Sequence, residues 1–169
     1  SNRTDDDFDA VDATVKEVIA RVRAEGDDAL YYYSEKFGGP GKAETGPLRV
    51  TEEELEEAYR SVEPEVTAAL ELAAENIRSF HEKQLQKTWS YTKGDNIMLG
   101  QLIVPIQNVG VYVPGGTAAY PSSVLMNAIP AKIAGVGELI MVTPAKNGVP
   151  NPDIMAADLI AGVDRVFLV

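Results

Sequence analysis

The stretch that decides the fold is VGVYVPGGTAAYPSSVLMNAIPAKIAGVGELIMVTP, residues 109–144. Its first five residues are apolar and mostly β-branched, which is typical of a buried strand. A Pro-Gly-Gly sequence then interrupts regular structure, and apolar residues recur at helical spacing from Val124 to Ile133. Residues 138–143 form a second apolar run. The order strand, loop, helix, strand predicts a βαβ unit of a parallel sheet.

The loop after the first strand carries the candidate chemistry. In open α/β sheets, ligands bind outside the carboxyl ends of the strands, and this loop follows such an end. Gly115 and Gly116 allow backbone N–H groups to approach a ligand closely. Ser122 or Ser123 is expected to cap the helix, whose N-terminus attracts phosphate or carboxylate. The pattern is neither G-x-G-x-x-G nor a P-loop, so an ordinary βα turn is an equal alternative.

A second unit of the same kind follows. Asn151 and Pro152 predict the start of a helix that ends at Gly162, and residues 164–169 are a third apolar strand. With right-handed crossovers, three parallel strands make half of a doubly wound sheet.

Residues 1–108 are expected to form a mostly helical part of a first domain, and 109–169 the start of a Rossmann-like NAD-binding domain. The spacing predicts four helices, at about 11–25, 29–36, 52–61 and 64–87. It also predicts a short strand at 48–50 and an extended segment at 97–107. Asp27 or Asp28 is expected to cap the second helix, and Thr51 with Glu54 forms a capping-box pattern. The helix from Pro64 is expected to turn one set of residues inward: Val66, Leu70, Ala73, Ile77 and Phe80.

The composition excludes several classes of protein. A net charge of −11 argues against nucleic-acid binding, and no apolar run approaches the roughly 20 residues that span a bilayer. With no signal peptide in the sequence, a soluble cytoplasmic protein is expected. The 169 residues include no cysteine and one histidine, His81, whereas zinc sites without cysteine usually need two or three histidines. We therefore expect His81 to be a partly exposed helix residue.

Three strings carry a resemblance to a known family. VGVYVPGGTAAYPSSVLMNAIPAKIAGV closely resembles histidinol dehydrogenase, and VKEVIARVRAEGDDALYYYSEKFGG (residues 15–39) and NIRSFHEKQ (residues 76–84) are similar to segments of the same family. The resemblance runs from about residue 11 to residue 169. It implies an α/β fold of the aldehyde-dehydrogenase-like superfamily, with an N-terminal helical segment followed by an incomplete Rossmann-like parallel βαβαβ unit. The implied activity is the NAD-dependent, zinc-dependent oxidation of L-histidinol through histidinal to L-histidine.

The resemblance also assigns roles to residues. Tyr112 matches the family's NAD-contacting tyrosine, although a core tyrosine is the alternative. Other residues are expected to shape the same pocket: Pro114, Gly115, Gly116, Ser122 and Ser123. Phe37 would lie near the cofactor, but Gly38 stands where the family has an acidic residue.

The resemblance implies no catalytic or metal-binding residue within this chain. The family's zinc ligands and its proton-transferring Glu–His pair are expected downstream of Val169, in a longer homodimeric protein that binds histidinol. Because the sequence stops inside an apolar strand, we expect an N-terminal fragment that is inactive alone. An unpaired edge strand or the long helix would favour self-association.

Two other functions are compatible with the sequence. A related dehydrogenase could oxidise another small polar alcohol, such as sulfopropanediol, since the substrate-selecting residues are not among these 169. A non-catalytic nucleotide-binding or assembly module that ends at Val169 is the second alternative.

Overall fold

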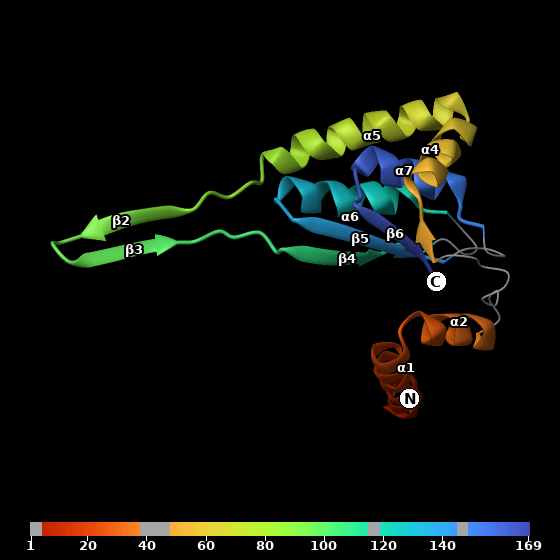
Figure 1. Ribbon diagram of the computed structural model, residues 1–169. Coiled ribbons are helices and arrows are strands. Elements are labelled where there is room, and N and C mark those ends of the chain that lie inside the picture. The colour runs from red at the N-terminus through yellow and green to blue at the C-terminus, as the bar shows by residue number, and fades with distance from the viewer. Residues whose placement is uncertain (1–4, 38–47, 115–118, 145–148) are drawn as a thin grey trace.

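The computed structural model describes residues 5–37, 48–114, 119–144 and 149–169 (Figure 1). Its elements follow in chain order: α1 (Asp5–Glu25), α2 (Asp27–Lys36), β1 (Arg49–Val50), α4 (Glu52–Ser61), α5 (Pro64–Glu82), β2 (Trp89–Lys93), β3 (Ile97–Gln101), β4 (Asn108–Tyr112), α6 (Pro121–Ile133), β5 (Glu138–Thr143), α7 (Pro152–Ala161) and β6 (Arg165–Leu168). The expected α/β class is confirmed.

The central sheet has the strand order β1-β6-β5-β4. Strands β4, β5 and β6 are parallel, as the βαβ pattern predicts. The short strand β1 pairs antiparallel with β6, so that Arg49 lies opposite Phe167 and Val50 opposite Val166. The sheet is therefore mixed rather than purely parallel, because a segment far away in sequence completes its edge.

Helices cover one face of this sheet (Figure 1). The chain steps from β4 to β5 to β6 in one direction, and right-handed crossovers then place α6 and α7 on the same side. Helix α4 packs on α7, and α5 packs on both α6 and α7. The core between these layers consists of apolar side chains with less than 2 % exposure from α6, α7 and the strands: Val113, Val124, Leu125, Ala128, Ile129, Leu139, Met141, Ile154, Met155, Ala156, Ala157 and Val166.

The core draws residues from both sides of the boundary expected near Asn108. Val50, Val62, Leu70 and Ala74 belong to the same buried cluster as the residues of α6 and α7. The division of the chain into two domains at residue 108, and the Rossmann-like character of residues 109–169, stay predictions.

Helices α4 and α5 begin as expected but α5 ends early. Thr51 Oγ1 accepts a 3.2 Å hydrogen bond from the Glu54 N–H, Thr51 N–H donates to Glu54 Oε2 at 2.7 Å, and Pro64 opens α5. The expected extension to residue 87 is wrong, since α5 ends at Glu82. Residues 83–88 form a turn and an irregular segment, and β2 begins at Trp89, where tryptophan, tyrosine and threonine favour a strand.

Two residues that were expected to face inward from α5 are exposed. Val66 and Phe80 have exposures of 39 % and 63 %, whereas Leu70 is buried. The Phe80 ring makes an edge contact with His81, at 5.3 Å between centroids, instead of entering the core.

Helices α1 and α2 pack on each other and lie apart from the helices on the sheet (Figure 1). Neither Asp27 nor Asp28 caps α2: Gly26 is the N-cap residue, with a φ of 62° that favours glycine and turns the chain sharply. Tyr33 is buried, and its hydroxyl donates to Glu17 Oε1 at 3.0 Å. Arg21 lies 3.8 Å over the Tyr32 ring.

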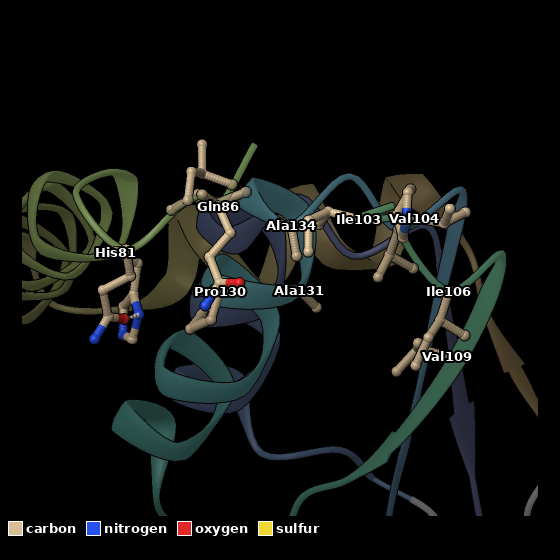
Figure 2. A pocket seen from close by; sticks show the side chains of 14 residues that line it. His81, Gln86, Ile103, Val104, Ile106, Val109, Pro130, Ala131 and Ala134 are labelled. Atoms are coloured by element: carbon tan, nitrogen blue, oxygen red, sulfur yellow. Dashed lines mark hydrogen bonds between the residues drawn. The ribbon is translucent and has the colours of Figure 1, made fainter. Parts of the chain in front are cut away.

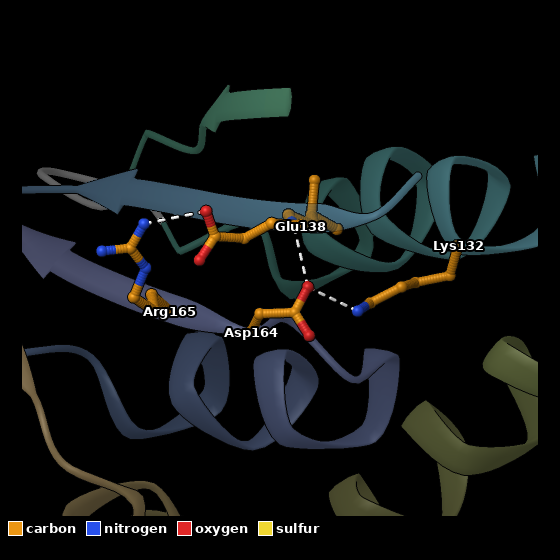
Figure 3. Close-up of polar contacts among 5 residues, drawn as sticks. Lys132, Glu138, Asp164 and Arg165 are labelled. Carbon is orange, nitrogen blue, oxygen red and sulfur yellow. Dashed lines mark hydrogen bonds and ion pairs between the residues drawn. The ribbon is translucent and has the colours of Figure 1, made fainter. Parts of the chain in front are cut away.

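A polar network joins α6, β5 and β6 near the amino ends of the strands (Figure 3). Asp164 Oδ2 accepts hydrogen bonds from Lys132 Nζ at 2.6 Å and from the Leu139 N–H at 2.7 Å. The hydrogen bond from Lys132 is the main cause that lowers the pKa of Asp164. Beside it, Arg165 Nη2 donates to Glu138 Oε2 at 2.9 Å. These contacts fix the start of β6 against the start of β5.

Unlike the carboxylates of Asp164 and Glu138, the carboxyl group of Asp158 has no basic partner among the described residues. Its side chain on α7 is 1 % exposed, and neither carboxyl oxygen has a hydrogen-bond partner among the described residues. Burial raises the pKa of this carboxyl to about 8. The folded chain therefore holds Asp158 in its protonated form at neutral pH.

This burial makes stability depend on pH. In the unfolded chain the Asp158 carboxyl loses its proton above roughly pH 4, whereas in the folded chain it keeps the proton up to about pH 8. Unfolding between these pH values therefore releases a proton. As a result, the free energy of unfolding decreases as pH rises through this range. We expect Asp158→Asn to remove this pH-dependent part of the free energy of unfolding, which is on the order of 5 kcal/mol between pH 4 and 8. Urea unfolding of both proteins at several pH values measures it. Parallel pH profiles for the two would contradict this account.

Candidate functional site

Tyr112 is the last residue of β4 and stands at the carboxyl edge of the sheet. The alternating residues Val109 and Val111 pack against the core, which places Tyr112 on the face opposite α6. Its side chain is 62 % exposed, so it is not a core tyrosine. An exposed aromatic ring at this edge is available to a ligand.

The chain turns away from the sheet directly after Tyr112. Val113 is buried and its N–H donates to the Val142 carbonyl at 3.0 Å, which ties the start of the loop to β5. Pro114 is exposed. Gly115 and Gly116 lie outside the described residues, so their role in shaping the pocket stays a prediction.

The expected serine cap of α6 is wrong. The helix begins at Pro121, Tyr120 is the N-cap residue, and no side chain caps the helix. Proline favours the first helical position because its φ is already helical and it has no N–H to satisfy. Ser122 and Ser123 therefore lie inside the first turn, two and three positions after the N-cap residue, and the Ser123 N–H donates to the Tyr120 carbonyl at 2.9 Å.

Among the described residues, no side chain neutralises the positive end of α6. Ser122 is exposed and Ser123 half-buried, so the first turn of the helix reaches solvent. Unpaired N–H groups and the helix dipole favour an anion such as a phosphate at this position.

Thr143 is a residue of this edge that the sequence did not single out. It ends β5, is 1 % exposed, and its hydroxyl has no hydrogen-bond partner among the described residues. In the sequence, a threonine at the end of an apolar strand does not indicate a functional site. Only the position of Thr143 beside Val113 at the carboxyl edge of the sheet brings it to attention. The Thr143 hydroxyl is buried on the helix-covered face, whereas Tyr112 is exposed on the opposite face, so at this edge Tyr112 and the uncapped start of α6 are the groups open to a ligand.

An apolar groove lies elsewhere, at the amino end of β4 (Figure 2). It has a volume of about 630 Å³, and its described lining includes Val104, Ile106, Val109 and Ala134 but no acidic or basic residue other than His81. As expected, His81 is a half-buried helix residue, and its Nδ1 lies 2.6 Å from Gln84 Oε1. This groove offers apolar contact but no pair of groups for acid–base chemistry.

Zinc is not accommodated by the part of the chain that is described. No three His, Cys, Asp or Glu side chains among these residues come together in a way that could hold a metal ion. Within the same residues, no helix has the length and apolar character needed to cross a membrane.

The fold and this edge define an α/β protein of the kind that binds its ligand where parallel strands give way to helices. A family model for histidinol dehydrogenase matches residues 1–169. The chain therefore belongs to the histidinol dehydrogenase family.

Individual relatives agree with this assignment. The chain is 49 % identical over 157 residues to the histidinol dehydrogenase of Geobacter sulfurreducens, covering 93 % of this chain and 37 % of that protein. It is 50 % identical over 159 residues to that of Syntrophotalea carbinolica, covering 94 % and 37 %. The crystal structure of histidinol dehydrogenase from Elizabethkingia anophelis superposes with a TM-score of 0.87 at 30 % identity, covering 99 % of this chain and 37 % of that one. The chain thus spans little more than a third of the length of these relatives.

The N-termini of α6 and α7 predict different losses of stability when a polar side chain there is replaced by alanine. Asn151 Oδ1 caps α7 by accepting hydrogen bonds from the N–H groups of Asp153 at 2.9 Å and Ile154 at 3.2 Å. We expect Asn151→Ala to lower the free energy of unfolding by about 1 kcal/mol, and Ser122→Ala by less than about 0.5 kcal/mol. Chemical denaturation measures both. An equal or larger loss for Ser122→Ala would show that this serine does cap α6.

Proposed function

We propose that this chain is the N-terminal part of an enzyme that oxidises L-histidinol to L-histidine with NAD and zinc, in the cytoplasm. Membership of the histidinol dehydrogenase family supports the reaction class. The observation that supports a cofactor role for this part of the enzyme is Tyr112, 62 % exposed at the carboxyl end of β4.

Each residue of the edge has a distinct task in this proposal. The Tyr112 ring stacks on or hydrogen-bonds to NAD, because its face is open to solvent and its backbone is fixed in the sheet. Pro114, Gly115 and Gly116 turn the chain so that the backbone comes close to the cofactor. The first turn of α6, with Ser122 and Ser123, faces the pyrophosphate through its N–H groups and helix dipole. The bound cofactor supplies the acceptor for hydride from the alcohol carbon.

The zinc part of the proposal concerns residues beyond these 169. Zinc sites that lack cysteine usually use two or three histidines, and this sequence contains His81 alone. We assign the metal, the histidinol pocket and the proton-transferring groups to the region of the relatives that this chain does not span.

The cofactor assignment is tested by NAD titration of the 169-residue chain. We expect Tyr112→Ala to weaken NAD binding about 5- to 20-fold, because an aromatic stacking partner contributes roughly 1 to 2 kcal/mol. Asn108→Ala is the matched control, since Asn108 is exposed on the same face at the other end of the same strand. Isothermal titration calorimetry measures both variants. Equal effects of the two, or none from Tyr112→Ala, would exclude the edge as the cofactor site.

The assignment of the reactive groups makes a second prediction. With NAD, histidinol and zinc supplied, the 169-residue chain should form no NADH above the rate without protein, because it cannot assemble a histidine-based zinc site. NADH absorbance follows the reaction, with a full-length histidinol dehydrogenase as the positive control. Zinc-dependent NADH formation by this chain would overturn the assignment.

A further inference from the structure

Phe37, the C-cap residue of α2, is an exposed aromatic ring that is supported on one face. Its ring stacks on that of Tyr33, with 5.9 Å between centroids and 17° between planes. The Phe37 N–H donates to the Tyr33 carbonyl at 3.0 Å, and a spacing of four residues places both side chains on the same side of the helix. The Phe37 side chain is nevertheless 65 % exposed. The face of this ring that turns away from Tyr33 is therefore open to a ligand.

Tyr33 is itself anchored to a second helix. It is 5 % exposed, and its hydroxyl donates to Glu17 Oε1 of α1 at 3.0 Å. Burial and this hydrogen bond raise the pKa of Tyr33, so the hydroxyl keeps its proton and remains a donor. A ring that is buried and tied at its hydroxyl supports the ring stacked on it in one orientation. We call Tyr33 and Phe37, with Glu17 as their anchor, the aromatic platform.

A basic side chain stands beside the aromatic platform. Lys36 is exposed, and its Nζ lies 5.4 Å from the centroid of the Tyr33 ring. Arg21 also approaches this ring, at 5.6 Å, but its guanidinium is bonded to Glu25, with Nε 2.8 Å from Oε1. An open aromatic face next to an exposed ammonium group suits a planar ring that is linked to phosphate, because the ring stacks while the cation attracts the phosphate.

The aromatic platform lies on the same side of the sheet as the Tyr112 ring. Figure 1 shows α1 and α2 on the side of the sheet opposite α5, α6 and α7. The alternation along β4 turns Tyr112 toward that same side. The platform and the proposed cofactor edge can therefore face one ligand.

The other exposed aromatic side chains of the described residues are placed less well for this role. Trp89 and Tyr91 belong to β2, which pairs with β3 in a hairpin that projects away from the sheet (Figure 1). Phe80 and Tyr120 belong to α5 and to the start of α6, on the helix-covered side. Tyr32 is on α2, but the Arg21 guanidinium covers its ring at 3.8 Å. Phe37 is therefore the open ring on the side of Tyr112.

We propose that Tyr33 is a positioning residue for the cofactor: anchored by Glu17, it holds the Phe37 ring so that its open face stacks on one of the two planar rings of NAD. This inference rests on the proposed function, in which Tyr112 contacts the other ring. A dinucleotide carries adenine and nicotinamide at its two ends, so two separate aromatic surfaces orient it better than one. Tyr33 acts through Phe37, because its own ring is buried.

The two halves of the cofactor separate the two aromatic contacts. Isothermal titration calorimetry of the 169-residue chain with AMP and with nicotinamide mononucleotide measures them. We expect Tyr33→Leu to weaken the binding of one half about 3- to 10-fold and Tyr112→Ala to weaken the binding of the other, since each stacking contact serves one ring. If both substitutions weaken the same half, or each weakens both halves equally, the proposal is overturned.

A double-mutant cycle with NAD separates positioning from a general structural role. Phe37→Leu and Tyr33→Leu should each weaken NAD binding by a similar factor, and Tyr33→Leu should cause no further loss in the Phe37→Leu background. Tyr33→Phe keeps the stacked ring and loses only the bond to Glu17, so it should weaken binding by no more than about 2-fold. Additive losses in the double variant would show that Tyr33 does not act through Phe37.

Tyr32→Leu is the matched control, because it makes the same change one residue earlier on α2. Tyr32 meets Tyr33 edge-on, with 83° between the ring planes, and Phe37 stacks on Tyr33 instead. Tyr32→Leu should leave the binding of both halves unchanged, and circular dichroism checks that all variants keep their helices. If Tyr112→Ala weakens NAD binding while Tyr33→Leu and Phe37→Leu do not, this inference is overturned and the proposed function stands. No effect of Tyr112→Ala would overturn both.

Discussion

The structure depends on the direction in which successive parallel strands, β4, β5 and β6, are added to the sheet. Both crossovers step the same way, from β4 to β5 and from β5 to β6, and both are carried by helices on one face. That face gains a continuous apolar core, while the other keeps half-buried residues such as Ile140, Val142 and Phe167. The exposure of Tyr112 follows directly, because its place in the β4 alternation puts it on the face without helices.

The two ends of the parallel strands serve different purposes. At the amino ends, Asp164 joins α6, β5 and β6 through hydrogen bonds and an ion pair, although the neighbouring Arg165 Nε is buried without a partner among the described residues. At the carboxyl ends, the Thr143 hydroxyl and the α6 N-terminus lack such partners among the described residues. Hydrogen-bonded polar groups stabilise the fold. The Thr143 hydroxyl is buried, whereas the first turn of α6 is open to solvent at Ser122 and its N–H groups are available to a ligand. This asymmetry is the physical basis of the cofactor proposal.

The hairpin of β2 and β3 and the edge of the sheet that carries Tyr112 are connected through β4. The chain leaves β3, passes Leu102 to Gln107 and enters β4, whose far end carries Tyr112. β4 is an edge strand of the sheet, so its outer side is not covered by another strand of the described chain.

Several helix ends could be predicted from the sequence, because they depend only on neighbouring residues. Thr51 with Glu54, Asn151 with Pro152, and Gly162 mark helix ends correctly, because capping and left-handed glycine depend on neighbouring residues. The same reasoning failed for Ser122 and Ser123, where Pro121 moved the helix start by fixing φ. Pairing between distant segments was beyond the sequence: β1 joins β6 through backbone hydrogen bonds that leave no residue pattern. The local pairing of β2 with β3 was not predicted from the sequence either. The sequence alone thus determined the parallel βαβ units and the family resemblance, and only the tertiary structure decided which faces stay open, because exposure depends on what packs against each face.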